Sequence, residues 1–401
     1  MPGAEIRLET KVAAEPAEVY QMFTNSTYLR YWLADVAISS PRPEGRLYLG
    51  WNDGYQTVGS YGKLDPGRRV SFGWHGSGDP GPTKVDIRIG PAEGGSLVRL
   101  RHWGFGDTRG ARKAAKSLKK AWTAALDNLS SVTESGADLR ITRRPLLGIF
   151  VAGEVTPERQ EEFGVDHGVR LGGVAVGLGA AGAGLRENDV ITRVGGRMVR
   201  GFDDLRAVVS EYRAGDTIDV EYVRSGEMRQ AVMELSGRQY GPLPATAREL
   251  AATVEQTHQR FLVGLEEALT GITEEEAWRP PGEEQWSVRE VLAHLIEGEI
   301  DGHALLVAQL EGVEPYYDGT FGNSNLRVHT GAASYPDIRS MVDACRRALT
   351  QTVLLLTALP EPVVARKPAF WRIAIGFGDL ESHLTEHLEQ IKAARADSGG
   401  E

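Results

Sequence analysis

The segment AGAGLRENDVITRVGGRMV, residues 181–199, contains the most informative local pattern in this chain. It opens with a turn of small residues and a Gly-Leu pair, and a second turn follows at Asn188-Asp189. The residues after that turn read as a strand, which continues into a hairpin at two adjacent glycines. The segment therefore predicts strands joined by tight turns.

This pattern resembles a PDZ domain of the kind appended to bacterial HtrA-type proteases, and the likeness covers residues 143–237. The resemblance implies that a protein C-terminal peptide adds as a strand beside the domain's edge strand, with its carboxylate held by backbone N–H groups. It assigns six residues to this groove: Leu147, Gly148, Ile149, Leu205, Val208 and Val209. A large side chain at Gly148 is expected to block the groove and leave the fold intact. Purely architectural use of the domain is the alternative, and no protease domain accompanies it, so we expect binding and not proteolysis.

The residues before this region show a different order of predicted elements. IRLETKV, residues 6–12, alternates as a strand does, and EPAEVYQMF then predicts a short helix. Short runs separated by glycines predict consecutive antiparallel strands between Gly45 and Gly106. AAKSLKKAWTAALDNLSSV closes the unit with apolar residues at helical spacing, which predicts a long helix with one face against the sheet.

Strand, helix, strands and long closing helix resemble the START-like (SRPBCC) superfamily, in particular the homologues of heat-shock ATPase activators. We assign this helix-grip domain to residues 1–135. In that fold the sheet wraps around the last helix and leaves a cavity, so the resemblance implies a site for a small apolar ligand. Four tryptophans are candidates to line it: Trp32, Trp51, Trp74 and Trp103. The alternative is that these large rings are ordinary core residues.

The last region, residues 245–395, has no strand pattern and predicts an all-α four-helix bundle. Ser287 and Glu290 form a capping box at the start of the second helix. The junctions TESGADLR and SGRQYGPLPATA are polar or rich in Gly and Pro, so we expect both to be exposed linkers between three separable units. The predicted helices span 247–269, 287–310, 335–358 and 376–395.

Three histidines lie at the edges of apolar stripes in this bundle. His383 and His387 are four residues apart in SHLTEHLEQI, so both rings can turn toward one point. His294 borders the apolar stripe of WSVREVLAHL, on a helix that can face the last one. Spacing alone permits a metal site and equally permits core-edge histidines with polar partners.

WSVREVLAHL together with SHLTEHLEQI resembles the DinB-like (YfiT-like) metal-binding four-helix bundles. One histidine of the second helix and an H-x-x-x-H pair of the fourth bind a divalent metal in that superfamily, which carries over to His294, His383 and His387. Zinc, nickel and iron all accept histidine ligands, so the identity of the metal stays open. His303 lies about 180° around the helix from His294 and is not expected to be a ligand. Asp379 is either a hydrogen-bond acceptor for an imidazole or a solvated carboxylate.

The composition limits the function classes. The chain has 401 residues, 41% hydrophobic and 25% charged, which predicts several folded domains, here multi-domain α+β. A net charge of −10 argues against general affinity for nucleic acid or anionic membrane. RKAAKSLKK is a local basic run that reads as the solvated face of a helix, with a basic patch as the alternative. Cys345 is the only cysteine and no signal sequence is evident, so we expect the cytoplasm.

Two functions compete at this stage. The first is a multi-domain binding protein with an apolar-ligand cavity, a peptide groove and a metal site, and one expectation is a role in stress or detoxification. The alternative is a metal-dependent thiol S-transferase, because some DinB-like proteins have this activity and a metal lowers the pKa of a bound thiol. A cationic pocket for an acidic thiol would favour the enzyme, and Arg327 and Arg372 are candidates for it.

Overall fold

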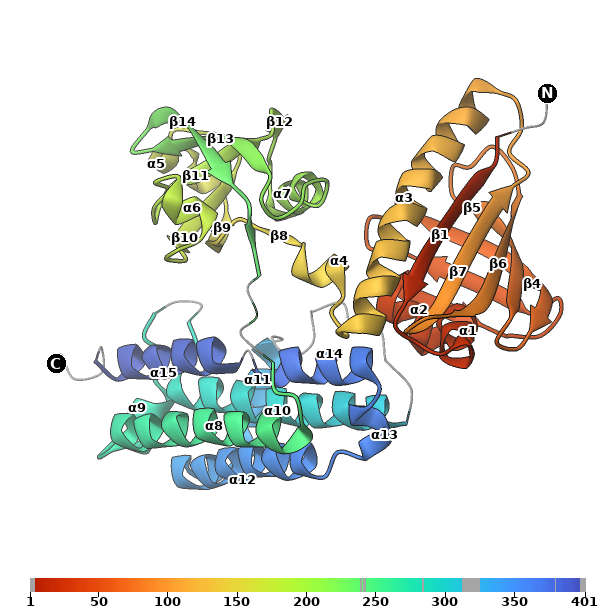
Figure 1. Cartoon of the computed structure of the whole chain (residues 1–401). Helices are drawn as coiled ribbons and strands as arrows, with labels where there is room; N and C mark the ends of the chain where they lie inside the picture. Colours follow the sequence, from red (N-terminus) through yellow and green to blue (C-terminus); the bar gives the residue numbers. More distant parts are fainter. Residues whose placement is uncertain are drawn as a thin grey trace.

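The computed structural model describes residues 4–238, 240, 243–282, 285–311, 325–378 and 380–396. Figure 1 shows an N-terminal region of sheet and helices, a smaller sheet domain and a C-terminal group of helices. The fold class predicted from the sequence is confirmed, because a START-like domain, a PDZ-like domain and a helical region follow one another. Among the described helices, none is long and apolar enough to cross a membrane.

The N-terminal region is a seven-stranded antiparallel sheet in the order β1-β7-β6-β5-β4-β3-β2, with α3 packed on it. Thr108 caps α3 by accepting a hydrogen bond from the Ala111 N–H, and Leu118, Trp122 and Leu126 are buried. The elements are β1 (Ile6–Val12), α1 (Pro16–Thr24), α2 (Ser26–Trp32), β2 (Val36–Ser39), β3 (Arg46–Gly50), β4 (Gln56–Asp65), β5 (Arg69–Gly76), β6 (Thr83–Ala92), β7 (Gly95–Trp103) and α3 (Arg109–Glu134).

The middle region is a six-stranded sheet in the order β14-β13-β11-β10-β9, with β12 paired to β11. The chain enters through β8 and leaves through β15, and these two short strands pair with each other. The elements are α4 (Leu139–Thr142), β8 (Pro145–Leu146), β9 (Ile149–Glu154), η1 (Pro157–Arg159), α5 (Gln160–Phe163), β10 (Val169–Val174), α6 (Gly179–Gly182), β11 (Val190–Val194), β12 (Arg197–Met198), α7 (Phe202–Val209), β13 (Thr217–Arg224), β14 (Glu227–Glu234) and β15 (Ser236–Gly237).

The C-terminal region contains more helices than the four predicted. The first three predicted helices correspond to α8, α10 and α12, and the fourth corresponds to α15, which α14 precedes. Pro362 and Pro368 each lie in the first turn of a helix, where proline is tolerated. The elements are α8 (Ala247–Leu269), α9 (Glu274–Trp278), α10 (Val288–Leu310), α11 (Asn325–Ala333), α12 (Ile338–Thr357), α13 (Glu361–Val364), α14 (Lys367–Gly378) and α15 (Leu380–Ala396).

The first junction is not the exposed linker that the sequence suggested, because α14 packs against it. The Arg372 guanidinium donates to Asp138 Oδ2 at 2.7 Å, and Asp138 is 1% exposed. Lys367 Nζ donates to the carbonyl oxygens of Thr133 at 3.1 Å and Glu134 at 3.0 Å, at the C-terminal end of α3. The START-like domain therefore contacts the helical region directly, and the PDZ-like domain is inserted between them on the β8/β15 pair.

Candidate metal centre and peptide groove

The three predicted histidines come together at one end of the helical region. Helix α10 begins with the predicted capping box, in which the Ser287 side chain accepts from the Glu290 N–H, and this helix carries His294. Helix α15 carries the other two. The Nε2 atom of His383 lies 3.4 Å from that of His294 and 3.1 Å from that of His387. One ligand nitrogen of each residue lies within 4.8 Å of the others.

The spacing of these nitrogens fits a shared metal ion. An ion with four tetrahedral ligands and nitrogens at about 2.0–2.1 Å holds neighbouring nitrogens roughly 3.3 Å apart. The two shorter distances in the cluster, 3.1 and 3.4 Å, lie on either side of this value. His294 is buried and His383 is exposed, so the cluster lies at the protein surface and has access to solvent.

The surroundings of His383 favour its neutral imidazole, the form that binds metals. The His387 Nδ1–H donates to Gln390 Oε1 at 2.9 Å, which leaves the Nε2 lone pair directed at the cluster. The pKa of His383 lies below its usual value because its ring is partly removed from water and His387 adjoins it. The Trp286 ring centroid lies 5.1 Å from that of His294. Sequence reasoning missed Gln390 and Trp286, although both stand in the two histidine motifs.

His303 lies apart from this cluster, as its helical position predicts. Its Nε2 is 2.7 Å from Thr352 Oγ1, and the Thr352 hydroxyl donates to the Glu299 carboxylate. Burial raises the pKa of Glu299 and lowers that of His303. These three buried side chains hydrogen-bond one another between α10 and α12, so they are explained by the packing of the two helices.

The two arginines considered for a cationic pocket are engaged elsewhere. Arg327 donates to Glu297 at 2.6 Å and to Asp301 at 2.6 Å. Arg372 lies in the contact with the START-like domain. Each guanidinium thus has a carboxylate partner within the chain, and Asp379 lies outside the described residues.

The residues predicted for the peptide groove lie just before β9, at its first residue, and on α7. Strand β9 is the end strand of its sheet, as the addition of a peptide strand requires. The α7 residues Leu205, Val208 and Val209 are buried in the domain core, and Leu147 and Ile149 pack against that core. The Phe202 N–H donates to Glu154 Oε1 at 2.9 Å, which ties the end of β9 to the start of α7.

Gly148 has a backbone φ of +75°, and a Cβ added there would lie 2.4 Å from the Leu178 Cβ. The expectation that a large side chain would leave the fold intact is therefore wrong, because left-handed backbone and this contact both oppose any side chain.

We expect Gly148→Ala to weaken binding of a C-terminal peptide more than 10-fold and to destabilise the domain, since left-handed backbone alone costs about 1–2 kcal/mol. Gly196→Ala is the matched control, because Gly196 has a φ of +74° but open space around it. Peptide titration and urea unfolding of both variants separate strain from the contact with Leu178. Equal binding by the two variants would remove Gly148 from the groove.

The four predicted cavity tryptophans do not line one space. Trp32 is fully buried and donates its indole N–H to the Met22 carbonyl at 2.9 Å. Trp51 and Trp74 belong to an aromatic cluster that reaches Trp122 of α3. The Trp74 ring centroid lies 6.1 Å from that of Trp51 and 5.3 Å from that of Trp122. Trp103 follows the fully buried His102 along β7, so it faces away from α3, with Arg101 4.6 Å above its ring.

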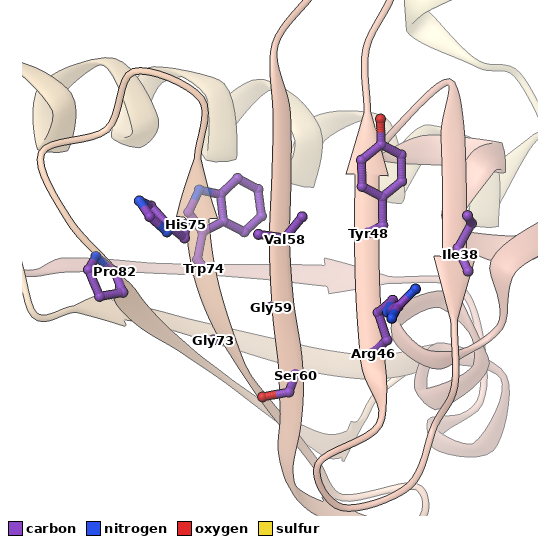
Figure 2. A pocket seen from close by; sticks show the side chains of 10 residues that line it. All are labelled: Ile38, Arg46, Tyr48, Val58, Gly59, Ser60, Gly73, Trp74, His75 and Pro82. Carbon is purple, nitrogen blue, oxygen red and sulfur yellow. The ribbon is translucent and has the colours of Figure 1, made fainter.

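A hollow of about 650 Å³ instead opens on strands β2 to β5 (Figure 2). Gly59 and Gly73 face each other there without side chains, and a Cβ on Gly59 would lie within 1.9 Å of the Gly73 carbonyl oxygen. Of the four predicted tryptophans, Trp74 lines this hollow. The lining residues are Ile38, Arg46, Tyr48, Val58, Gly59, Ser60, Gly73, Trp74, His75 and Pro82.

His102 makes the stability of the START-like domain sensitive to acid. The Trp122 indole N–H donates to His102 Nδ1 at 3.0 Å, and burial lowers the His102 pKa to about 4. The unfolded chain binds this proton near pH 6.5, so stability present above that pH is lost as the pH falls toward 4. We expect a loss of about 2 kcal/mol between roughly pH 7 and 5. Urea unfolding followed by tryptophan fluorescence measures it, and His102→Gln should flatten the dependence; an unchanged slope would contradict this role.

Comparisons with known proteins agree with two of the three regions. The family model for activator of Hsp90 ATPase homolog 1-like proteins matches residues 13–134, and the PDZ domain model matches residues 147–235. Two proteins described as serine protease Do-like HtrA, from Lactococcus lactis subsp. lactis and subsp. cremoris, are 29% and 40% identical over 167 and 166 residues. Each alignment covers 38% of this chain and 40% of the relative, so the chain spans well under half the length of these proteins.

Solved structures also match about a third of this chain. The Aha1 dimer from Colwellia psychrerythraea is 19% identical, with a TM-score of 0.29, and the match covers 33% of this chain and 96% of that one. CalU16 from Micromonospora echinospora is 23% identical, with a TM-score of 0.25 and coverage of 31% and 70%. On the two family models, the chain contains a START-like domain of the Hsp90 ATPase activator-like family and a PDZ domain, followed by a helical region outside both matches.

Proposed function

We propose that this chain is a multi-domain binding protein that holds a divalent metal ion at His294, His383 and His387 and a protein C-terminus in its PDZ groove. The observation that carries the metal site is the convergence of three imidazoles from two helices, with Nε2 separations of 3.1 and 3.4 Å. We also propose the modules 1–135, 143–237 and 245–395 and a small-ligand site in the first of them.

The resemblance to DinB-like bundles supports the metal proposal. Three neutral histidines with further positions open to solvent form a reactive or exchangeable site, in contrast to a closed structural one. When bound, the metal would act as a Lewis acid toward a thiol or water. The chain itself orients the ligands, through Gln390 at His387 and through the packing of Trp286 on His294. Zinc, nickel and iron are the candidates.

The geometry favours binding over the alternative, a metal-dependent thiol S-transferase. An acidic thiol needs a cation near the metal, but Arg327 is paired with two carboxylates and Arg372 with Asp138. A screen of thiols and electrophiles with metal-loaded protein tests this preference. Turnover above that of the free metal ion would favour the enzyme.

Elemental analysis of the protein purified without an affinity tag tests the metal site. We expect about one divalent ion per chain. Titration of C-terminal peptides, each with a free or an amidated end, tests the groove. Retained affinity after amidation would contradict carboxylate capture, because the amide removes the charge that the N–H groups bind.

A further inference from the structure

The solvent face of α3 carries a continuous stripe of positive charge. Six cations lie within about 16 Å of helix length and an arc of about 120°, since residues advance about 1.5 Å and 100° each. We call this set the α3 cation stripe, and all six side chains are exposed: Arg109, Arg112, Lys113, Lys116, Lys119 and Lys120.

The stripe is not neutralised within the described part of the chain. None of its six members forms an ion pair there, and the first acidic residue of α3 is Asp127. Several cations on the sheet of the same domain are paired, as with Arg69 and Asp86 or Arg101 and Glu5. Like charges three and four residues apart destabilise a helix, so this arrangement works against the stability of α3. Neutralisation by a bound partner offsets that repulsion.

The stripe lies on the face of α3 that points away from the sheet. The buried residues of α3, such as Leu118 and Trp122, face the sheet, and the cations lie on the opposite side. In the view of Figure 1, the PDZ domain lies on the side of α3 away from the sheet. A protein whose C-terminus is held by the PDZ domain would therefore be tethered on the side of α3 that points away from the sheet.

We propose that the α3 cation stripe binds an acidic segment of the same protein whose C-terminus the PDZ groove holds, an inference that rests on the proposed groove. The net charge of −10 repels a large polyanion such as nucleic acid or an anionic membrane at long range. A short acidic segment brings few charges, and most of them lie within a Debye length, about 8 Å, of the stripe. Tethering through the groove raises its effective concentration, so two weak contacts give one stronger interaction.

The test uses the full chain and a labelled peptide with a run of glutamates, a Gly-Ser linker of about 5, 10 or 20 residues and an apolar C-terminal end. The stripe variant replaces Lys113, Lys116, Lys119 and Lys120 by glutamine. The control variant does the same at Arg42, Lys63, Arg68 and Lys84, four exposed cations of the same domain. All eight positions are exposed, so circular dichroism should show both variants folded.

We expect the stripe variant to bind the acidic peptide at least 10-fold more weakly at low salt, and the control variant less than 3-fold. Replacing the glutamates by glutamine should abolish the difference. Equal binding by wild type and stripe variant overturns the inference, while dependence on a free peptide carboxylate still supports the groove. If binding no longer depends on a free peptide carboxylate but still weakens in the stripe variant, the result counts against the groove and against the tethering proposed here. If duplex DNA displaces the labelled peptide at a lower concentration of negative charge than unlabelled acidic peptide does, the inference is overturned in favour of nucleic acid.

Discussion

Replacing His383 by alanine is expected to lower metal affinity more than about 100-fold. Loss of a residue that only hydrogen-bonds a metal ligand typically costs roughly 10–100-fold, and loss of the ligand itself should cost more. His383 is the central member of the cluster, because its Nε2 is close to those of both His294 and His387. Its removal leaves two nitrogens, too few to hold the ion against water. His294→Ala and His387→Ala should act in the same direction.

Titration calorimetry with zinc and nickel, together with elemental analysis, measures this effect. His329→Ala is the matched control in the same region, since His329 is exposed and contacts Glu290. Bound metal stabilises only the folded state, so a chelator should lower the melting temperature of wild type and leave that of His383→Ala unchanged. Stoichiometric metal in all three variants would show that the histidines are core-edge residues.

Asp138→Ala is expected to destabilise the contact between the START-like domain and the helical region by about 3–5 kcal/mol, the typical cost of breaking a buried ion pair. Burial by itself would raise the pKa of Asp138, but Arg140 and Arg372 hold it below its usual range. The substitution leaves the Arg372 guanidinium, only 14% exposed, without this carboxylate. Asn128, which donates to Asp138 Oδ1 at 2.9 Å, loses an acceptor as well.

Urea unfolding and limited proteolysis at residues 133–143 test this prediction. The wild type should resist cleavage at this junction, and Asp138→Ala should be cut there early. Asp127→Ala is the control, because Asp127 is an exposed aspartate near the same end of α3. Matching stability and cleavage in the two variants would mean that the domains are held together by other contacts.

The sequence by itself determined the order of the modules and the metal candidates. Strand alternation, turn glycines and the closing helix are local patterns, and two of the three regions they predict match family models. The two histidine motifs predicted the residues that the structure brings together, because helical spacing fixes which side chains share a face. Helix α14 was missed, since proline in a first turn cannot be distinguished locally from proline in a loop.

Only the tertiary structure decided which surfaces meet. The sequence gives no sign that Asp138 lies under Arg372, because the two residues are far apart in the chain and an ion pair depends on their separation in space. The same holds for the tryptophans: four rings were candidates from the sequence, and the strand register turned Trp103 away from the helix that Trp74 faces. At Gly148 the turn requires glycine locally, but the contact with Leu178 exists only once two loops have packed together. Local periodicity determines which segments form helices and strands and which side chains share a face. Contacts between residues of different domains depend on how whole surfaces pack together, and no local sequence pattern determines that.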